Sequence, residues 1–221
     1  MGTLAQSLTA PIRSFIRWYL KKPRSFTYNE IKAIVLPGVF HPGFFHSTKI
    51  LLDYLSGLEL KDQTFLEIGS GTGVISVCAA LRKAKVTAID ISPAAVENTF
   101  LNQINNKVEF TVLKSDLFEK LDSAQFDWVV INPPYYPSKA QSDADYAWYC
   151  GEGHEYFHKL FSQLRQFIHA QSQVLIVLSE VCDLDTIFSI GRINSFEFDK
   201  ILEKKVWVDG HNYLFLIKSI T

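Results

Sequence analysis

Residues 64–74 read TFLEIGSGTGV, an apolar run followed by glycine at positions 69, 71 and 73. The apolar part predicts a short strand over Thr64–Ile68, and the residues after the glycines predict a helix over Val74–Lys83. Glycine lacks a Cβ, so the connecting loop lets the backbone approach a bulky ligand. Dinucleotide-binding loops follow the pattern G-x-G-x-x-G, but Val74 and Ser76 stand where that pattern has glycine. We therefore expect a strand–loop–helix unit that binds a ligand other than a dinucleotide.

The alternation of strand and helix continues toward the C-terminal end of the chain. Further strands are predicted at Lys85–Ile91, Val108–Leu113, Phe126–Ile131 and Val174–Leu178, and further helices at Pro93–Asn105, 154–170 and 183–193. The chain ends in two predicted strands, Phe196–Val208 and Tyr213–Ile217, on either side of a turn. Such alternation predicts a parallel sheet with right-handed crossovers, to which the final hairpin adds one antiparallel strand. The expected fold class is α/β, with a doubly wound sheet of seven strands.

The N-terminal part lacks this regular alternation. Residues 4–22 predict a helix that Pro23 ends, residues 25–36 predict one or two short strands, and residues 47–57 predict another helix. We therefore expect an N-terminal extension over residues 1–35 and a single α/β domain over residues 36–221.

Composition and charge narrow the class of protein. The 221 residues are 48% hydrophobic and 20% charged, which excludes disordered, collagen-like and coiled-coil proteins. The net charge of −1 argues against a dedicated nucleic-acid binder, although residues 1–30 hold five basic residues and one acidic residue. Three scattered cysteines form neither a disulfide framework nor a metal pair, and no run of about 18 apolar residues predicts a membrane span. We expect a cytoplasmic protein.

Three acidic residues lie at or after the ends of predicted neighbouring strands. Glu67 precedes the first glycine and suits a ligand that carries a cation. Asp90 follows Gly69 by 21 residues, a distance at which an acid can accept hydrogen bonds from both hydroxyls of a ribose. Asp116, after the third strand, could accept from an adenine amino group. The alternative is that the glycines only form turns and the acids only cap helices.

The fourth strand is followed by Asn132-Pro133-Pro134-Tyr135. The oxygens of the Asn132 side chain and the Pro133 carbonyl could accept the two hydrogens of a planar –NH₂ group. The prolines fix the loop, and Tyr135 offers a flat face for stacking. This arrangement would direct the nitrogen lone pair toward an electrophile. The alternative is a rigid loop with no chemical role.

Together these motifs resemble class I S-adenosylmethionine-dependent methyltransferases with a Rossmann-like seven-stranded sheet, over about residues 36–217. The likeness is strongest to the N-P-P-Y group: release-factor glutamine methyltransferases, adenine-amino methyltransferases and small-domain rRNA guanine methyltransferases. It implies S-adenosylmethionine as cofactor, acceptor-binding residues at Asn132, Pro133, Pro134 and Tyr135, and cofactor-binding residues at Thr48, Glu67, Gly69, Gly71, Gly73, Asp90, Ile91, Asp116, Leu117 and Asn132.

The acceptor is less well defined than the cofactor. Residues 147–153, AWYCGEG, are similar to the region after N-P-P-Y in glutamine methyltransferases of the short eukaryotic and archaeal type. We therefore expect a protein glutamine amide as acceptor, with a small activating partner protein allowed by the resemblance. The exocyclic amine of an RNA or DNA base is the alternative, favoured by the basic N-terminal segment. A minor alternative is a protein that binds the cofactor without catalysing methyl transfer.

One motif suggests different chemistry. His154-Glu155-Tyr156-Phe157-His158 matches the H-E-x-x-H helix of zinc proteases, and Glu180 lies 22 residues later as a third ligand candidate. Glu180 ends a predicted strand rather than a helix. We therefore expect a solvated helix start here and no metal.

Overall fold

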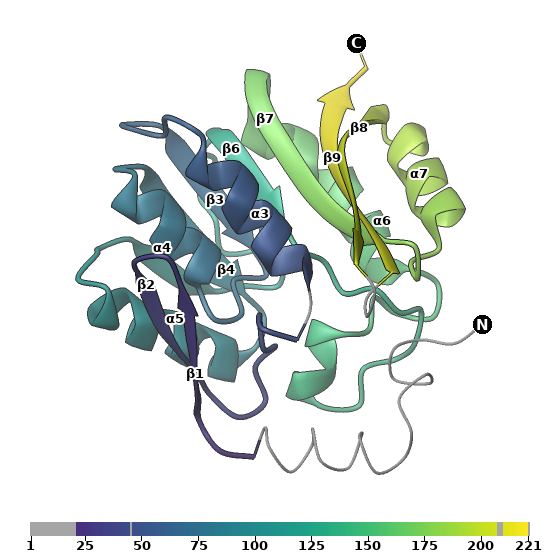
Figure 1. Cartoon of the computed structure of the whole chain (residues 1–221). Coiled ribbons are helices and arrows are strands. Elements are labelled where there is room, and N and C mark those ends of the chain that lie inside the picture. Colours follow the sequence, from purple (N-terminus) through teal and green to yellow (C-terminus); the bar gives the residue numbers. More distant parts are fainter. Residues whose placement is uncertain (1–20, 45, 207–209, 221) are drawn as a thin grey trace.

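A computed structural model of the chain describes residues 21–44, 46–206 and 210–220. The helix predicted for residues 4–22 lies almost wholly outside the described residues. A seven-stranded sheet runs through the centre, and helices cover both of its faces (Figure 1). No helix within the described ranges is both long enough and apolar enough to span a membrane.

The central sheet has the strand order β5-β4-β3-β6-β7-β9-β8. Five of its strands are parallel: β3 (Thr64–Ile68), β4 (Lys85–Asp90), β5 (Thr111–Lys114), β6 (Phe126–Ile131) and β7 (Ile168–Ser179). The last strand, β9 (Gly210–Ser219), runs antiparallel between β7 and β8 (Phe196–Val206). The predicted α/β class, with a doubly wound sheet and an antiparallel C-terminal hairpin strand, is confirmed.

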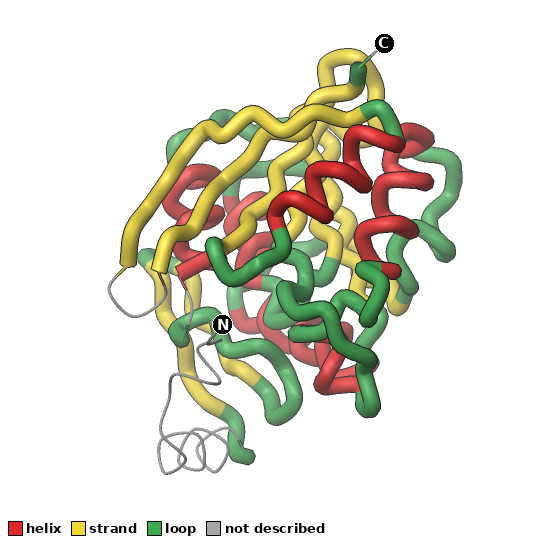
Figure 2. Tube along the Cα trace, turned by 90° about the vertical axis from the view of Figure 1, so that its right-hand side faces the viewer, coloured by secondary structure: helices red, strands yellow, loops and turns green. Residues whose placement is uncertain are grey.

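Two hydrophobic cores lie on opposite faces of this sheet. One face carries α3 (His46–Ser56), α4 (Val74–Leu81) and α5 (Pro93–Asn105), and the other carries α6 (Glu155–Leu164) and α7 (Leu184–Ile193). Figure 2 shows helices on both sides of the strand layer. Successive residues of β7 contribute to different cores, because side chains alternate across a strand: Ile176 packs toward α6 and Val177 toward α3.

A two-stranded hairpin, β1 (Arg24–Tyr28) and β2 (Ile31–Val35), lies outside α5. Three asparagines spaced four residues apart bind the backbone of the segment 32–36: Asn98 and Asn102 on one face of α5, and Asn106 directly after its C-terminal end. The most buried contact comes from Asn102, whose side chain accepts from Ile34 N at 2.8 Å and donates to Ile34 O and Thr72 O. The hairpin edge is thus tied to the domain by side-chain amides.

The prediction of one helix over residues 154–170 is wrong at its C-terminal end. Helix α6 ends at Leu164, a 3₁₀ turn covers Arg165–Phe167, and β7 already begins at Ile168. The residues after the turn are held as strand by long-range bonds: Ser172 Oγ donates to Phe126 O at 2.6 Å, and His169 Nε2 lies 3.1 Å from Asp127 Oδ1. These partners are more than 40 residues away, so local helix propensity did not reveal them.

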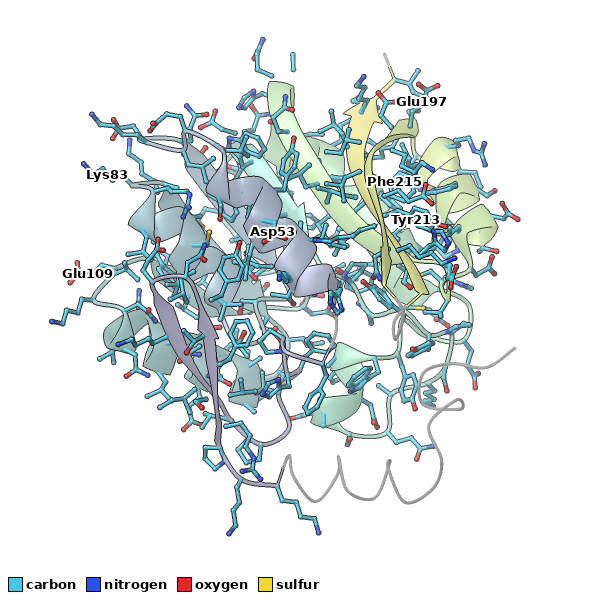
Figure 3. The ribbon with its side chains drawn as sticks, in the orientation of Figure 1. Asp53, Lys83, Glu109, Glu197, Tyr213 and Phe215 are labelled. Carbon is cyan, nitrogen blue, oxygen red and sulfur yellow. The ribbon has the colours of Figure 1, made fainter. Side chains whose placement is uncertain are left out.

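Two other strand boundaries also differ from the prediction. The strand expected at Val108–Leu113 is β5, over Thr111–Lys114, because Val108 N and Phe110 O are bonded to Gln103 of α5 instead of a strand. The last strand is twice as long as expected. Its side chains Tyr213 and Phe215 point toward α7 (Figure 3), where the Phe215 ring lies 5.1 Å from that of Phe188.

Candidate active site

A cleft of about 640 Å³ opens where the carboxyl ends of β3, β4, β5 and β6 meet. Doubly wound sheets bind their ligands at this edge. The cleft brings together nearly all the site residues predicted from sequence: Thr48, Glu67, Gly69, Gly71, Asp90, Ile91, Asp116, Leu117, Asn132, Pro133, Pro134 and Tyr135. Gly73 is the one predicted site residue that does not line it.

The three glycines after β3 have different surroundings. All three have positive φ, at 76°, 52° and 71°, a conformation that other residues rarely adopt. A Cβ on Gly71 would have no atom within 4 Å, so this glycine leaves the cleft open to a ligand. A Cβ on Gly73 would lie 2.8 Å from Thr99 Cγ2 and 3.0 Å from Thr99 Cα. Gly73 therefore lets α4 pack closely on α5.

Asp90 ends β4 and holds the glycine loop in place. Its Oδ2 accepts from Gly71 N at 2.8 Å and its Oδ1 accepts from Ser92 N at 2.9 Å. Burial raises the pKa of Asp90, and these backbone N–H donors oppose that rise. Each carboxylate oxygen has a second acceptor site, so Asp90 can bind a ligand hydroxyl while it holds the loop.

Glu67 is buried beneath the loop, with 2% of its surface exposed. Its Oε2 accepts from the backbone N–H of Ser76 at 2.8 Å and also from the Ser76 hydroxyl. Burial raises its pKa from 4.5 to about 8; the Ser76 bonds oppose this rise and the charge of Asp90 adds to it. A cation placed beside Glu67 would favour the ionised form, so the cleft is suited to an ammonium group at this position.

The end of β5 contributes Asp116 and Leu117. Asp116 Oδ2 lies 2.6 Å from Lys159 Nζ, and the same amine lies 2.5 Å from Glu119 Oε1. Sequence reasoning placed an acceptor for an amino group here, and the structure adds a lysine from α6 beside it. Leu117 has a φ of 51°, so the backbone turns sharply at the cleft wall.

Asn132 follows β6, and its side chain is held from two sides. Its Nδ2 donates to Thr48 Oγ1 at 3.4 Å, and its Oδ1 accepts from the Tyr135 hydroxyl at 3.3 Å. Thr48 lies in the first turn of α3 and is 4% exposed. Both bonds are at the long end of the hydrogen-bond range, so a ligand can replace either partner. Helix α3 and the loop after β6 therefore orient one carboxamide into the cleft.

The segment after the N-P-P-Y motif closes the side of the cleft. Tyr136 N donates to Trp148 O, and Cys150 N donates to Tyr136 O, both at 2.9 Å. The Trp148 ring lies 5.3 Å from that of Phe40, which precedes α3. These contacts fold residues 147–153 back against the loop after β6, so two separate stretches of chain form one wall.

The family model for the methyltransferase small domain matches residues 30–188. The chain belongs to this family. The prediction of a class I S-adenosylmethionine-dependent methyltransferase is thereby confirmed, both as an enzyme class and in its cofactor.

Relatives and structural neighbours support this membership. A Methanocaldococcus jannaschii protein, whose name proposes protein N5-glutamine methyltransferase activity, is 33% identical over 69% of this chain and 79% of its own length. Ribosomal RNA small subunit methyltransferase C of Buchnera aphidicola is 33% identical over 48% of this chain and 33% of its own. The solved E. cuniculi Mtq2–Trm112 complex, responsible for methylating the eRF1 translation termination factor, matches with a TM-score of 0.61 at 19% identity, over 82% of this chain and 99% of that one. At that identity the structural likeness concerns the fold alone.

Several residues that line the cleft of the methyltransferase were not predicted from the sequence, and two of them come from α6. Tyr156 and Lys159, from the first two turns of α6, line the cleft next to the ends of β4 and β5. Tyr156 stands at a variable position of the H-E-x-x-H match and Lys159 directly follows that match, and both fall in the stretch interpreted as a solvated helix start. An amphipathic pattern in which Tyr156 and Lys159 share one helical side was the only available signal.

The H-E-x-x-H match lacks the geometry of a zinc helix. His154 precedes α6 in a left-handed conformation, with a φ of 59°, so it does not share a helical face with His158. Its Nε2 lies 3.8 Å from Asp183 Oδ2. Over residues 21–44, 46–206 and 210–220, no group of three His, Cys, Asp or Glu side chains could hold a metal ion.

Proposed function

We propose that this methyltransferase transfers a methyl group from S-adenosylmethionine to a planar –NH₂ nitrogen, and that the acceptor is the side-chain amide of a protein glutamine. The observation that carries the proposal is the Asn132 carboxamide, held between Thr48 and Tyr135 at the cleft and followed by two prolines. The Asn132 Oδ1 and the Pro133 carbonyl would accept the two hydrogens of the acceptor. A planar amide held this way directs its nitrogen lone pair away from both oxygens.

The residues of the cleft fit S-adenosylmethionine. We assign Gly69 and Gly71 to the close approach of the loop, Asp90 to the ribose hydroxyls and Asp116 to the adenine amine, with Ile91 and Leu117 beside them. Glu67 would bind the ammonium end, where the cation relieves the cost of ionising a buried carboxyl. A volume near 640 Å³ lies in the usual range of small-molecule sites, about 300–1,000 Å³. Gly73 acts in packing.

The bound cofactor would supply an activated methyl group on a sulfonium. The work left to the protein is to hold the acceptor nitrogen in line and to exclude water. As the nitrogen gains positive character, the oxygens of Asn132 and Pro133 stabilise it because their dipoles already point there. Tyr135 would stack on the flat amide and keep it from turning. The acceptor proton then leaves to solvent.

The charges around the cleft favour a protein acceptor over a nucleic acid. Besides Glu67, which is buried and largely protonated at neutral pH, five acidic side chains line the cleft and two basic ones do: Asp90, Asp116, Asp143, Glu152 and Glu155 against Lys139 and Lys159. Lys159 is already paired with two carboxylates, so it offers little to a phosphate. A polyphosphate backbone would be repelled by such a rim, whereas a neutral or basic peptide would not. The archaeal relative named for glutamine methylation supports the same choice.

The second candidate is a base amine of RNA or DNA. It is favoured by the basic residues at the N-terminal side, of which Lys21, Lys22 and Arg24 belong to the described part, and by the rRNA methyltransferase relative. Phosphate contacts would make substrate binding fall steeply with salt, whereas a peptide acceptor would show a shallow dependence.

Two further assignments belong to the same proposal. We take residues 36–221 as the methyltransferase domain and residues 1–35 as an extension of it. We also include a small partner protein, because the E. cuniculi Mtq2 chain is described in complex with Trm112.

Labelling of a cell lysate tests the acceptor. The chain is incubated with lysate and S-adenosylmethionine that carries a labelled methyl group, and samples are digested with protease or nuclease. We expect label that protease releases and nuclease leaves in place, with amino-acid analysis giving methylated glutamine. The Asn132→Ala variant is the matched control and should transfer about 10²–10³ times less label. Label released only by nuclease would replace the glutamine proposal with the base-amine one.

A further inference from the structure

Lys159 joins helix α6 to the loop that follows β5. Its Nζ lies 2.6 Å from Asp116 Oδ2 and 2.5 Å from Glu119 Oε1. Lys159 lies in the second turn of α6, 43 residues after Asp116, and both residues line the cleft. Their side chains are 29% and 45% exposed, so a ligand in the cleft can reach this pair. The function proposed above assigns Asp116 to the adenine amine and leaves Lys159 without a role.

The stability of the fold gives little reason for this ion pair. Pairs between exposed side chains stabilise a protein only weakly, because solvent screens the charges and two flexible side chains must be held still. The loop after β5 is also held by other bonds: Ser115 N donates to Asp90 O at 2.9 Å, and Ser115 Oγ donates to Leu117 O at 2.6 Å. The main effect of Lys159 therefore falls on the Asp116 carboxylate and on what that carboxylate can bind.

The geometry lets Lys159 orient Asp116 in two ways. A carboxylate has two oxygens, and the ammonium of Lys159 binds Oδ2, so Oδ1 can accept a hydrogen bond from a ligand. Asp116 and Glu119 contact the same ammonium, so they lie close together and would repel each other without it. The Asp116 side chain, which is nearly half exposed, would then be free to turn toward solvent. Lys159 thus holds an acceptor oxygen at the cleft.

We propose that Lys159 is a positioning residue for the cofactor, which holds the Asp116 carboxylate so that its second oxygen accepts a hydrogen bond from the adenine amine. The proposal rests on the function proposed above, because it requires an adenosine ligand at Asp116. It makes the pair of Lys159 and Asp116 a determinant of base specificity. A purine with hydrogen in place of the amine would leave the oriented carboxylate without a donor.

Calorimetry with two ligands tests the proposal without any methyl acceptor. One ligand is S-adenosylhomocysteine, and the other is its 6-deamino analogue, in which hydrogen replaces the adenine amine. The wild type should prefer the adenine form. Lys159→Met should bind S-adenosylhomocysteine roughly three- to tenfold more weakly and should bind the deamino analogue as the wild type does, because only the bond to the amine is weakened. A general change of charge or packing would weaken both ligands alike.

Two further variants serve as controls. Lys114→Met, at the end of β5 and outside the cleft lining, removes the same charge and should bind both ligands as the wild type does. Lys159→Arg should keep part of the preference for adenine, because a guanidinium also binds carboxylates.

A double substitution shows whether Lys159 acts through Asp116. In the Asp116→Ala background, Lys159→Met should change the affinity for S-adenosylhomocysteine by less than about twofold. A full further loss there would overturn the positioning role. So would unchanged or tighter binding of S-adenosylhomocysteine by Lys159→Met alone, or equal losses for both ligands; these outcomes leave the cofactor assignment intact. A wild type that binds both ligands alike would overturn the assignment of Asp116 as well, and absence of binding to the wild type would overturn the cofactor assignment.

Discussion

Substituting Glu67 with glutamine removes a buried carboxyl whose titration depends on the fold. Glu67 is 2% exposed, and burial raises its pKa from 4.5 to about 8. Between pH 4.5 and pH 8, Glu67 is protonated in the folded chain and ionised in the unfolded chain. Its contribution to the free energy of unfolding is therefore complete below pH 4.5 and is lost as the pH rises toward 8. At about 1.4 kcal/mol per pH unit, the difference between the two pKa values limits the contribution of Glu67 to the free energy of unfolding to roughly 5 kcal/mol.

Urea denaturation of the ligand-free protein measures this effect. From pH 5 to pH 8 the free energy of unfolding of the wild type should fall by roughly 3 kcal/mol more than that of Glu67→Gln, which does not titrate. Groups that do not interact with Glu67 titrate alike in the two proteins, so the difference reports Glu67 together with its coupling to Asp90. Parallel pH profiles from pH 5 to pH 8 would refute the reasoning and would mean that the carboxyl ionises freely in the folded state.

Binding of the cofactor product should be coupled to the loss of a proton from the Glu67 carboxyl. If Glu67 binds the ammonium end of S-adenosylhomocysteine, the cation favours ionisation and the wild type should release a proton on binding at pH 7. Calorimetry in two buffers with different ionisation enthalpies counts that proton. Glu67→Gln should release none, and equal heats for the wild type in both buffers would contradict the assignment.

Three further substitutions test the site and its scaffold. Asn132→Ala should lower turnover by about 10²–10³ and leave S-adenosylhomocysteine affinity nearly unchanged, measured by methyl transfer and calorimetry; wild-type turnover would exclude the planar-nitrogen mechanism. Gly73→Ala should destabilise the fold by about 1–3 kcal/mol in thermal unfolding, because its methyl group would meet Thr99 at a positive φ. Asn102→Ala should lower the free energy of unfolding by about 2–3 kcal/mol, because it leaves Ile34 N and Thr72 O without their side-chain partner, whereas Ile34 O keeps its bond from Asn98; a change below 0.5 kcal/mol would show that the hairpin is not held this way.

The sequence by itself determined which strand ends converge at the site. The apolar runs before the glycine loop, before Asp90 and before Asn132 are local signals of strands, and the helices between them require those strands to be parallel. Carboxyl ends of parallel strands meet at one edge, so residues that follow different strands had to converge there. Those signals are short-range, because each depends on a few adjacent residues and on the period of the side chains.

Only the tertiary structure decided which groups meet across long sequence separations. Residues 168–173 are strand because Phe126 and Asp127 bind them, and Gly73 lies against Thr99 of α5 and does not line the cleft. Lys159 of α6 reaches Asp116 after β5, 43 residues earlier in the chain, and no local pattern predicted this pair. Local pattern gives the direction of a side chain on its own element, but the partner it meets depends on how elements far apart in the chain pack together.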